Sequence, residues 1–141
     1  MVMQDLFRKY GVNTRGLPSV TPRETLELLQ QGALIVDLRE TGFADFKAFG
    51  VNNVINAPLS NFDEAAESLD PNAHYILADS SGLKTRLCAG ALLDKGFQHV
   101  AIMGGGFIEW ERDGLPVFTD VNERLSGPCP CQLKARERKK T

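Results

Sequence analysis

The chain has 141 residues, of which 43% are hydrophobic, and a formal net charge of −2. This length and composition predict one domain that fills a single core without a metal or a crosslink. The longest apolar runs, at 33–36 and 89–93, are too short to span a bilayer. The N-terminal residues lack the uninterrupted apolar stretch and the small-residue cleavage site of a secretory signal. We therefore expect a cytoplasmic protein that makes no use of a membrane.

The charge is distributed unevenly along the chain. Residues 132–141 hold five lysine or arginine residues and one glutamate, a net +4, so that residues 1–131 carry −6. A nucleic-acid-binding domain concentrates basic groups on one face, and the acidic body of this chain does not. We therefore expect no nucleic-acid partner for the domain itself.

The first half of the chain opens with a short amphipathic helix at 3–10 and a linker. A short strand is expected at Ser19–Val20. Thr21-Pro22-Arg23-Glu24 matches a capping box with proline at the first helical position, which predicts a helix that ends near Gln31. The following run at 33–38, ALIVDL, is rich in branched residues and predicts a strand that is covered on both faces.

The second half of the chain continues this alternation. We expect strands at 54–55, 75–78 and 99–103, and helices at 62–69, 86–95 and 107–112. Strands that alternate with helices at short spacing predict an α/β fold, with a parallel sheet between helices on both faces. Ligands of such sheets bind beyond the carboxyl ends of strands, where a loop leads into a helix. The loop after Ala78 has this position.

This loop is interpreted as an anion-cradling turn. It consists of Asp79, Ser80, Ser81, Gly82, Leu83, Lys84 and Thr85. The first turn of a helix offers unpaired backbone N–H groups and the positive end of the helix dipole, which together attract anions. Lys84 fits either a cation that neutralises such an anion or a solvated surface charge. The hydroxyl residues fit either donors to a ligand or helix caps.

Several short motifs follow one another in a specific order. They are Asp37-Leu38-Arg39, Asn56-Ala57-Pro58-Leu59, the loop at 79–85, Lys95-Gly96-Phe97, Met103-Gly104-Gly105, Trp110 and Gly114-Leu115-Pro116-Val117. Together they resemble the rhodanese-like domain family over residues 18–118, which leaves an N-terminal appendage at 1–17 and a tail at 119–141. The resemblance implies a five-stranded parallel sheet flanked by helices. It also implies an active-site loop of the form Cys-x-x-Gly-x-Arg-Ser, whose cysteine accepts sulfane sulfur as a persulfide.

The loop departs from that pattern at its most important position. The resemblance places Gly82 on the family glycine, Lys84 on its arginine and Thr85 on its serine, but it places Asp79 on the cysteine. A carboxylate is weakly nucleophilic and forms no persulfide, so ordinary rhodanese chemistry is excluded at this loop. Asp79 fits a helix-capping acid. A phosphoryl-accepting aspartate is the alternative, but no neighbouring carboxylate cluster for magnesium is visible.

A second departure lies between Arg39 and Asn56. The family usually has Glu-Phe/Tyr-x-x-Gly-His-Ile in this stretch, whereas this chain has DFKAFGV at 45–51. The expected histidine is absent and the spacing is about two residues longer. Both departures indicate a degenerate catalytic site.

The other residues of reactive type have simpler interpretations. Cys88 is expected to be a small core residue on the same helix face as Leu92, and Trp110 a core anchor. His74 and His99 each begin a strand and have no partner at a metal-ligand spacing. We expect no metal site and no cofactor.

Cys129-Pro130-Cys131 lies beyond the domain and precedes cations that favour thiolates. The pair fits a sulfur-accepting or redox site, half of a soft-metal site completed by another chain, or two thiols without a role. Two functions therefore stay open. One is a degenerate module that binds a small anion or a protein partner through the Asp79 loop. The other is a sulfurtransferase-related protein or sulfur carrier that uses Cys129 and Cys131.

Overall fold

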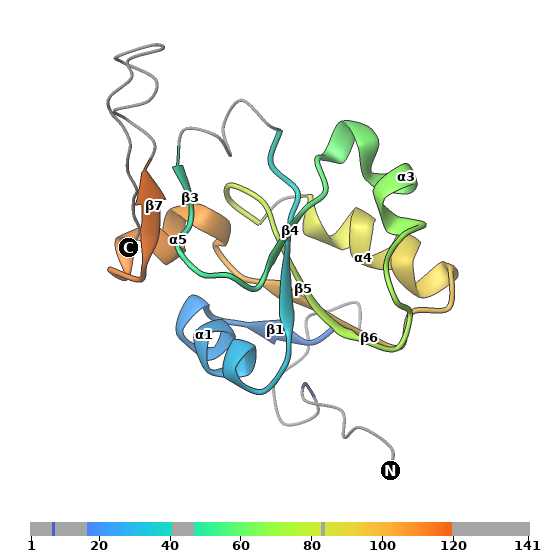
Figure 1. Ribbon diagram of the computed structural model, residues 1–141, viewed down its shortest axis with the longest axis horizontal. Helices are drawn as coiled ribbons and strands as arrows, with labels where there is room; N and C mark the ends of the chain where they lie inside the picture. The colour runs from blue at the N-terminus through green and yellow to red at the C-terminus, as the bar shows by residue number, and fades with distance from the viewer. Residues whose placement is uncertain (1–6, 8–16, 41–46, 83, 120–141) are drawn as a thin grey trace.

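A computed structural model describes residues 7, 17–40, 47–82 and 84–119 of the chain (Figure 1). The elements are β1 (Ser19–Val20), α1 (Pro22–Gln30), β2 (Leu34–Asp37), β3 (Lys47–Phe49), β4 (Val54–Asn56), the 3-10 helix η1 (Leu59–Asn61), α3 (Phe62–Ala66), β5 (His74–Ala78), α4 (Thr85–Asp94), β6 (His99–Met103), α5 (Gly106–Arg112) and β7 (Val117–Thr119). Within these ranges no helix is long and apolar enough to cross a membrane.

The main sheet has five strands in the order β1-β6-β5-β2-β4, and every neighbouring pair is parallel. This confirms the predicted five-stranded parallel sheet. β5 lies at its centre, and all five of its residues are buried. In the register, Ile76 of β5 lies opposite Ile35 of β2 and Ala101 of β6.

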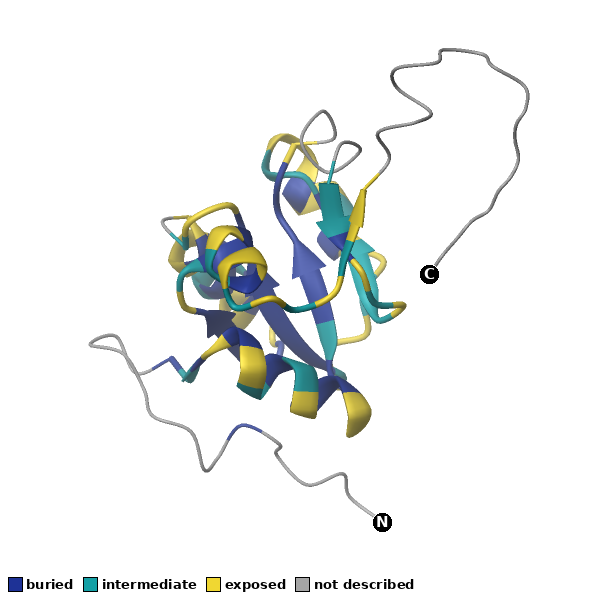
Figure 2. Cartoon of the chain, turned by 90° about the vertical axis from the view of Figure 1, so that its left-hand side faces the viewer, coloured by how far each residue is buried: buried dark blue, intermediate teal, exposed yellow. Residues whose placement is uncertain are grey.

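Helices cover both faces of the sheet, α1 and α5 on one side and α3 and α4 on the other (Figure 1). Successive strand residues point to opposite faces. Ile76 accordingly belongs to the core cluster that includes Leu28 of α1, whereas its neighbour Leu77 belongs to the cluster that includes Leu92 of α4. Figure 2 shows the central strands buried over most of their length and α1 exposed on its outer side.

The start of α1 confirms the predicted capping box. The Thr21 hydroxyl accepts from the Glu24 N–H at 3.1 Å, and the Glu24 carboxylate accepts from the Thr21 N–H at 2.9 Å. Pro22 occupies the first helical position. Two otherwise unpaired N–H groups are thereby satisfied, which stabilises the helix start.

Two features differ from the predictions. β3 and β7 form a separate antiparallel pair, with Ala48 opposite Phe118, and neither strand was predicted. The two strands lie about seventy residues apart in the sequence, so no local pattern indicates that they pair. α3 ends at Ala66 rather than at residue 69.

The predicted helix at 3–10 lies outside the described residues except for Phe7. This side chain is only 2% exposed, and its ring meets the His74 ring edge-on at 5.3 Å between centroids. Phe7 therefore contributes to the core from a segment that the sequence assigns to an appendage.

Candidate functional site

The loop from Asp79 onwards lies between the carboxyl end of β5 and the start of α4, as predicted. Asp79 is 8% exposed, and its carboxylate turns back toward the backbone of its own loop. One carboxylate oxygen accepts from the Gly82 N–H, and the other accepts from the Lys84 N–H at 2.7 Å. Leu83, which lies between these donors, is outside the described residues.

Through these two hydrogen bonds, the amides of the predicted anion-cradling turn donate to a carboxylate of the same loop, that of Asp79. Lys84 is the N-cap residue of α4, and its own side chain makes no capping hydrogen bond. The carboxylate of Asp79 therefore takes the place of a side-chain cap, at the end of the helix where the dipole favours negative charge. Gly82 completes the turn with φ of +93°, a conformation that favours glycine. The Thr85 hydroxyl donates to the Gly82 carbonyl at 3.2 Å.

Residues at and just after the glycine-rich turn that follows β6 form backbone hydrogen bonds with the loop. The backbone carbonyl of Asp79 accepts from the Phe107 N–H at 2.8 Å, and that of Ser80 accepts from the Ile108 N–H at 3.0 Å. A Cβ atom on Gly106 would lie only 2.4 Å from the Asp79 carbonyl oxygen. In the sequence, Met103-Gly104-Gly105 was one of the ordered motifs, and the turn was assigned no contact with the loop. The run of three glycines was the available signal that another backbone approaches closely.

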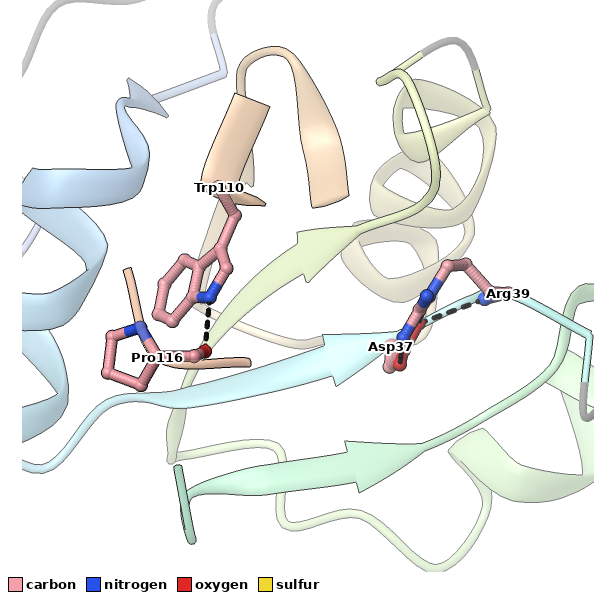
Figure 3. Close-up of polar contacts among 4 residues, drawn as sticks. All are labelled: Asp37, Arg39, Trp110 and Pro116. Carbon is pink, nitrogen blue, oxygen red and sulfur yellow. Dashed lines mark hydrogen bonds and ion pairs between the residues drawn. The ribbon is translucent and has the colours of Figure 1, made fainter. Parts of the chain in front are cut away.

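A buried ion pair lies next to the loop (Figure 3). The Arg39 guanidinium donates to both carboxylate oxygens of Asp37, at 3.0 and 2.9 Å, and the Arg39 N–H also donates to Asp37 at 3.1 Å. The Arg39 side chain lies over the Phe107 ring, 4.0 Å from its centroid. Asp37 is paired in register with Ala78, the residue before Asp79. The pair therefore connects the end of β2 with the turn that holds the loop.

Trp110 is fully buried, which confirms the predicted core anchor. Its indole N–H donates to the Pro116 carbonyl at 2.7 Å (Figure 3), and the Gly50 N–H donates to the same oxygen at 2.8 Å. The Phe49 ring meets the indole edge-on at 5.0 Å. Trp110 thus holds the β3–β7 pair beside α5.

The part of the loop that faces solvent is polar. Ser80, Ser81 and Lys84 are exposed, as is Arg86 in the first turn of α4. Leu87 follows with 75% of its surface exposed. A molecule that approaches the loop therefore meets two hydroxyl groups, two cations and one apolar side chain.

Cys88 lies in the core beside Leu92, as predicted. Burial raises the pKa of its thiol to about 11, and the carboxylates of Asp79 and Asp63 add to the increase. The thiol is therefore protonated at neutral pH, which makes it a poor nucleophile.

The predicted start of a strand at each histidine is confirmed: His74 begins β5 and His99 begins β6. Their rings stack with centroids 4.0 Å apart. Among the described residues there is no group of His, Cys, Asp and Glu side chains that could hold a metal ion. Cys129 and Cys131 lie outside those residues, so their role stays a prediction.

The fold and the position of the loop define a class of α/β domain, and comparison with known proteins identifies the family. The model of the rhodanese-like domain family matches residues 21–113. The chain belongs to this family. It is 34% identical, over 101 residues, to a protein of Haemophilus influenzae named thiosulfate sulfurtransferase GlpE, a match that covers 71% of this chain and 93% of that protein.

Solved structures have the same fold. A rhodanese-related protein from Thermoplasma volcanium superposes with a TM-score of 0.64 at 23% identity, covering 71% of this chain and 96% of that one. A polysulfide-sulfur transferase homodimer from Wolinella succinogenes also superposes with a TM-score of 0.64, at 20% identity, covering 72% and 78%. These structures share the α/β architecture of this chain.

Proposed function

We propose that this rhodanese-like domain performs no sulfur transfer at the Asp79 loop and that it serves as a binding module for a protein partner. The observation that carries the proposal is the pair of hydrogen bonds from Gly82 and Lys84 to the Asp79 carboxylate. A nucleophilic sulfur is absent from this position, and the carboxylate uses the amides that would otherwise stabilise an anion there.

The same geometry favours a protein partner over a small anion. The two amides already donate to a charged group, and a second anion at this place would be repelled by the first. The accessible donors are instead the side chains of Ser80, Ser81 and Lys84, which face outward. These groups suit a partner surface that supplies hydrogen-bond acceptors or carboxylates across a wider area.

A second candidate function is supported by the name of the relative from Haemophilus influenzae, thiosulfate sulfurtransferase. If this chain transfers sulfur, the tail thiols Cys129 and Cys131 are the residues able to carry it, because Cys88 is buried and protonated. In this alternative the domain is a platform for the tail.

One assay separates the two functions. The full chain is incubated with thiosulfate and cyanide, and thiocyanate is measured for the wild type, for the double variant Cys129→Ser with Cys131→Ser, and for Asp79→Cys. We expect no turnover by the first two proteins. In Asp79→Cys the new thiolate is expected to attack the outer sulfur of thiosulfate, breaking the S–S bond and releasing sulfite, and cyanide then removes the sulfur as thiocyanate.

The possible results have distinct meanings. Wild-type turnover that disappears in the double variant would support the tail thiols and contradict the binding module. Wild-type turnover that persists in the double variant would contradict both functions. A site-specific photo-crosslinker at Ser81 tests binding directly: a specific partner should be captured, and its yield should fall when Lys84→Glu is added, whereas Lys95→Glu at the other end of α4 serves as the matched control.

A further inference from the structure

An open groove lies between α3 and α4. These two helices cover the face of the sheet opposite α1 (Figure 1). The volume of the groove is about 390 Å³. One wall is formed by η1 and the first turn of α3, and the other by Leu87, Cys88 and Ala91 of α4. Leu87 is 75% exposed at its edge, the largest exposed fraction among the exposed large hydrophobic side chains of the described residues.

The rim of this groove is acidic. Asp63 and Glu64 line it and are exposed. Residues 59–73 contain four carboxylates and neither lysine nor arginine. A groove that combines apolar lining residues with carboxylates suits a segment in which an apolar side chain is followed by a dense run of cations.

The sequence contains one segment with this pattern. Residues 132–141, QLKARERKKT, carry a net charge of +4 and include Leu133 between polar and basic residues. No other stretch of the sequence is as densely cationic. Its charge matches the −4 of residues 59–73 in magnitude and is opposite in sign.

The chain is long enough to bring the segment to the groove. β7 ends at Thr119, on the far side of the domain from α3 (Figure 1). The 14 residues from Thr119 to Leu133 reach about 46 Å when extended at about 3.3 Å each. A domain of about 100 residues has a radius of gyration of about 13 Å, and thus a diameter of about 34 Å, which is shorter than the extended segment.

We propose that the basic C-terminal segment, residues 132–141, docks in the α3–α4 groove of its own chain. Leu133 packs beside Leu87, and the cations face Asp63 and Glu64. The docked segment covers the exposed Leu87 and places Cys131, two residues before Leu133, close to α4. The contact is an intramolecular one that high salt weakens, because its charges lie at the surface.

A spin label on the tail tests the contact in the full chain. In a Cys129→Ser variant the label is attached to Cys131, since the buried, protonated thiol of Cys88 reacts poorly. Paramagnetic broadening of backbone amide signals is then measured by NMR against a diamagnetic label. We expect selective broadening at 62–66 and 87–91, and its loss at about 1 M salt, where the screening length is about 3 Å.

Two charge-reversal variants provide a matched comparison. Glu64→Lys on the rim should greatly reduce the broadening, whereas Glu27→Lys on the exposed face of α1 changes the charge equally and should leave it unchanged. Leu133→Ser should also reduce it. Equal effects of Glu64→Lys and Glu27→Lys, or no selective broadening at the groove, would overturn the proposal.

A mixture of two samples tests whether the tail docks on its own chain or on a second copy. Spin-labelled chains without ¹⁵N are combined with ¹⁵N-labelled chains that carry no spin label. No broadening is expected in this mixture, because each tail occupies its own groove. Groove broadening as strong as in the singly labelled sample would show that the tail binds a second copy and would overturn the intramolecular contact.

Discussion

The carboxylate of Asp79 accepts a hydrogen bond from the backbone N–H of Lys84, five residues later, at 2.7 Å. This hydrogen bond and the one from the Gly82 N–H together anchor the loop to the start of α4. The residue that is predicted to replace the family's nucleophile thus has a structural role.

Asp79→Ala should destabilise the domain by about 1–3 kcal/mol, because two backbone N–H groups lose a charged acceptor at a largely buried place. The measurement is the free energy of unfolding from chemical denaturation. Asp70→Ala is the matched control: the Asp70 carboxylate accepts from the Asn72 N–H at 2.9 Å but is exposed, so water replaces it. Similar losses in the two variants would show that Asp79 does not cap α4 in this way.

Asp37→Ala should cost about 3–5 kcal/mol, because it leaves the buried Arg39 guanidinium without its partner. Thermal and chemical unfolding measure the loss. Glu111→Ala removes a comparable ion pair with Lys47, but those side chains are 42% and 40% exposed, and the expected loss is below about 1 kcal/mol. A small effect of Asp37→Ala would contradict the structural importance of the buried pair.

Gly106→Ala should destabilise the protein more than Gly114→Ala. Both glycines have positive φ, +60° and +78°, which costs a non-glycine residue about 1–3 kcal/mol. A Cβ at Gly114 meets no atom within 4 Å, whereas at Gly106 it would strike the Asp79 carbonyl. NMR shift changes for Gly106→Ala should extend to the amides of residues 79–82. Equal unfolding free energies would contradict the close approach.

The Cys88 thiol should react slowly with iodoacetamide at neutral pH in a variant that lacks the tail thiols. Its rate should rise about tenfold per pH unit toward a pKa of about 11. Because this pKa lies above the ordinary value of 9.0, the folded protein holds the proton more tightly than the unfolded chain. The resulting stability is complete below about pH 9 and is lost as the pH rises toward 11. Cys88→Ala should remove this pH dependence, and an unchanged dependence would assign it to other groups.

Much of the architecture could be read from neighbours along the sequence. The capping box from Thr21 to Glu24 and the branched run at 33–38 involve residues that are close together in the chain, so local propensity and burial determine them. The burial of Cys88 could be inferred from its place on the same helix face as Leu92, and that of Trp110 from the ordered motifs. Together with the ordered motifs, these signals also gave the family.

Contacts between distant segments required the tertiary structure. The β3–β7 pair joins residues about seventy positions apart, so no local pattern in the sequence indicates it. The stacking of Arg39 on Phe107 likewise depends on how β2 and α5 meet.

The Asp79 loop shows the division most clearly. The sequence alone predicted that a carboxylate stands where the family has a thiol, and it determined that a helix begins soon afterwards. Only the tertiary structure decided that this carboxylate turns inward to the amides of Gly82 and Lys84, with Gly106 packed behind it. The physical reason is that the direction of a side chain depends on the space and the hydrogen-bond donors around it. Here both depend on the turn after β6, and the backbone of this turn contacts the loop only in the folded domain.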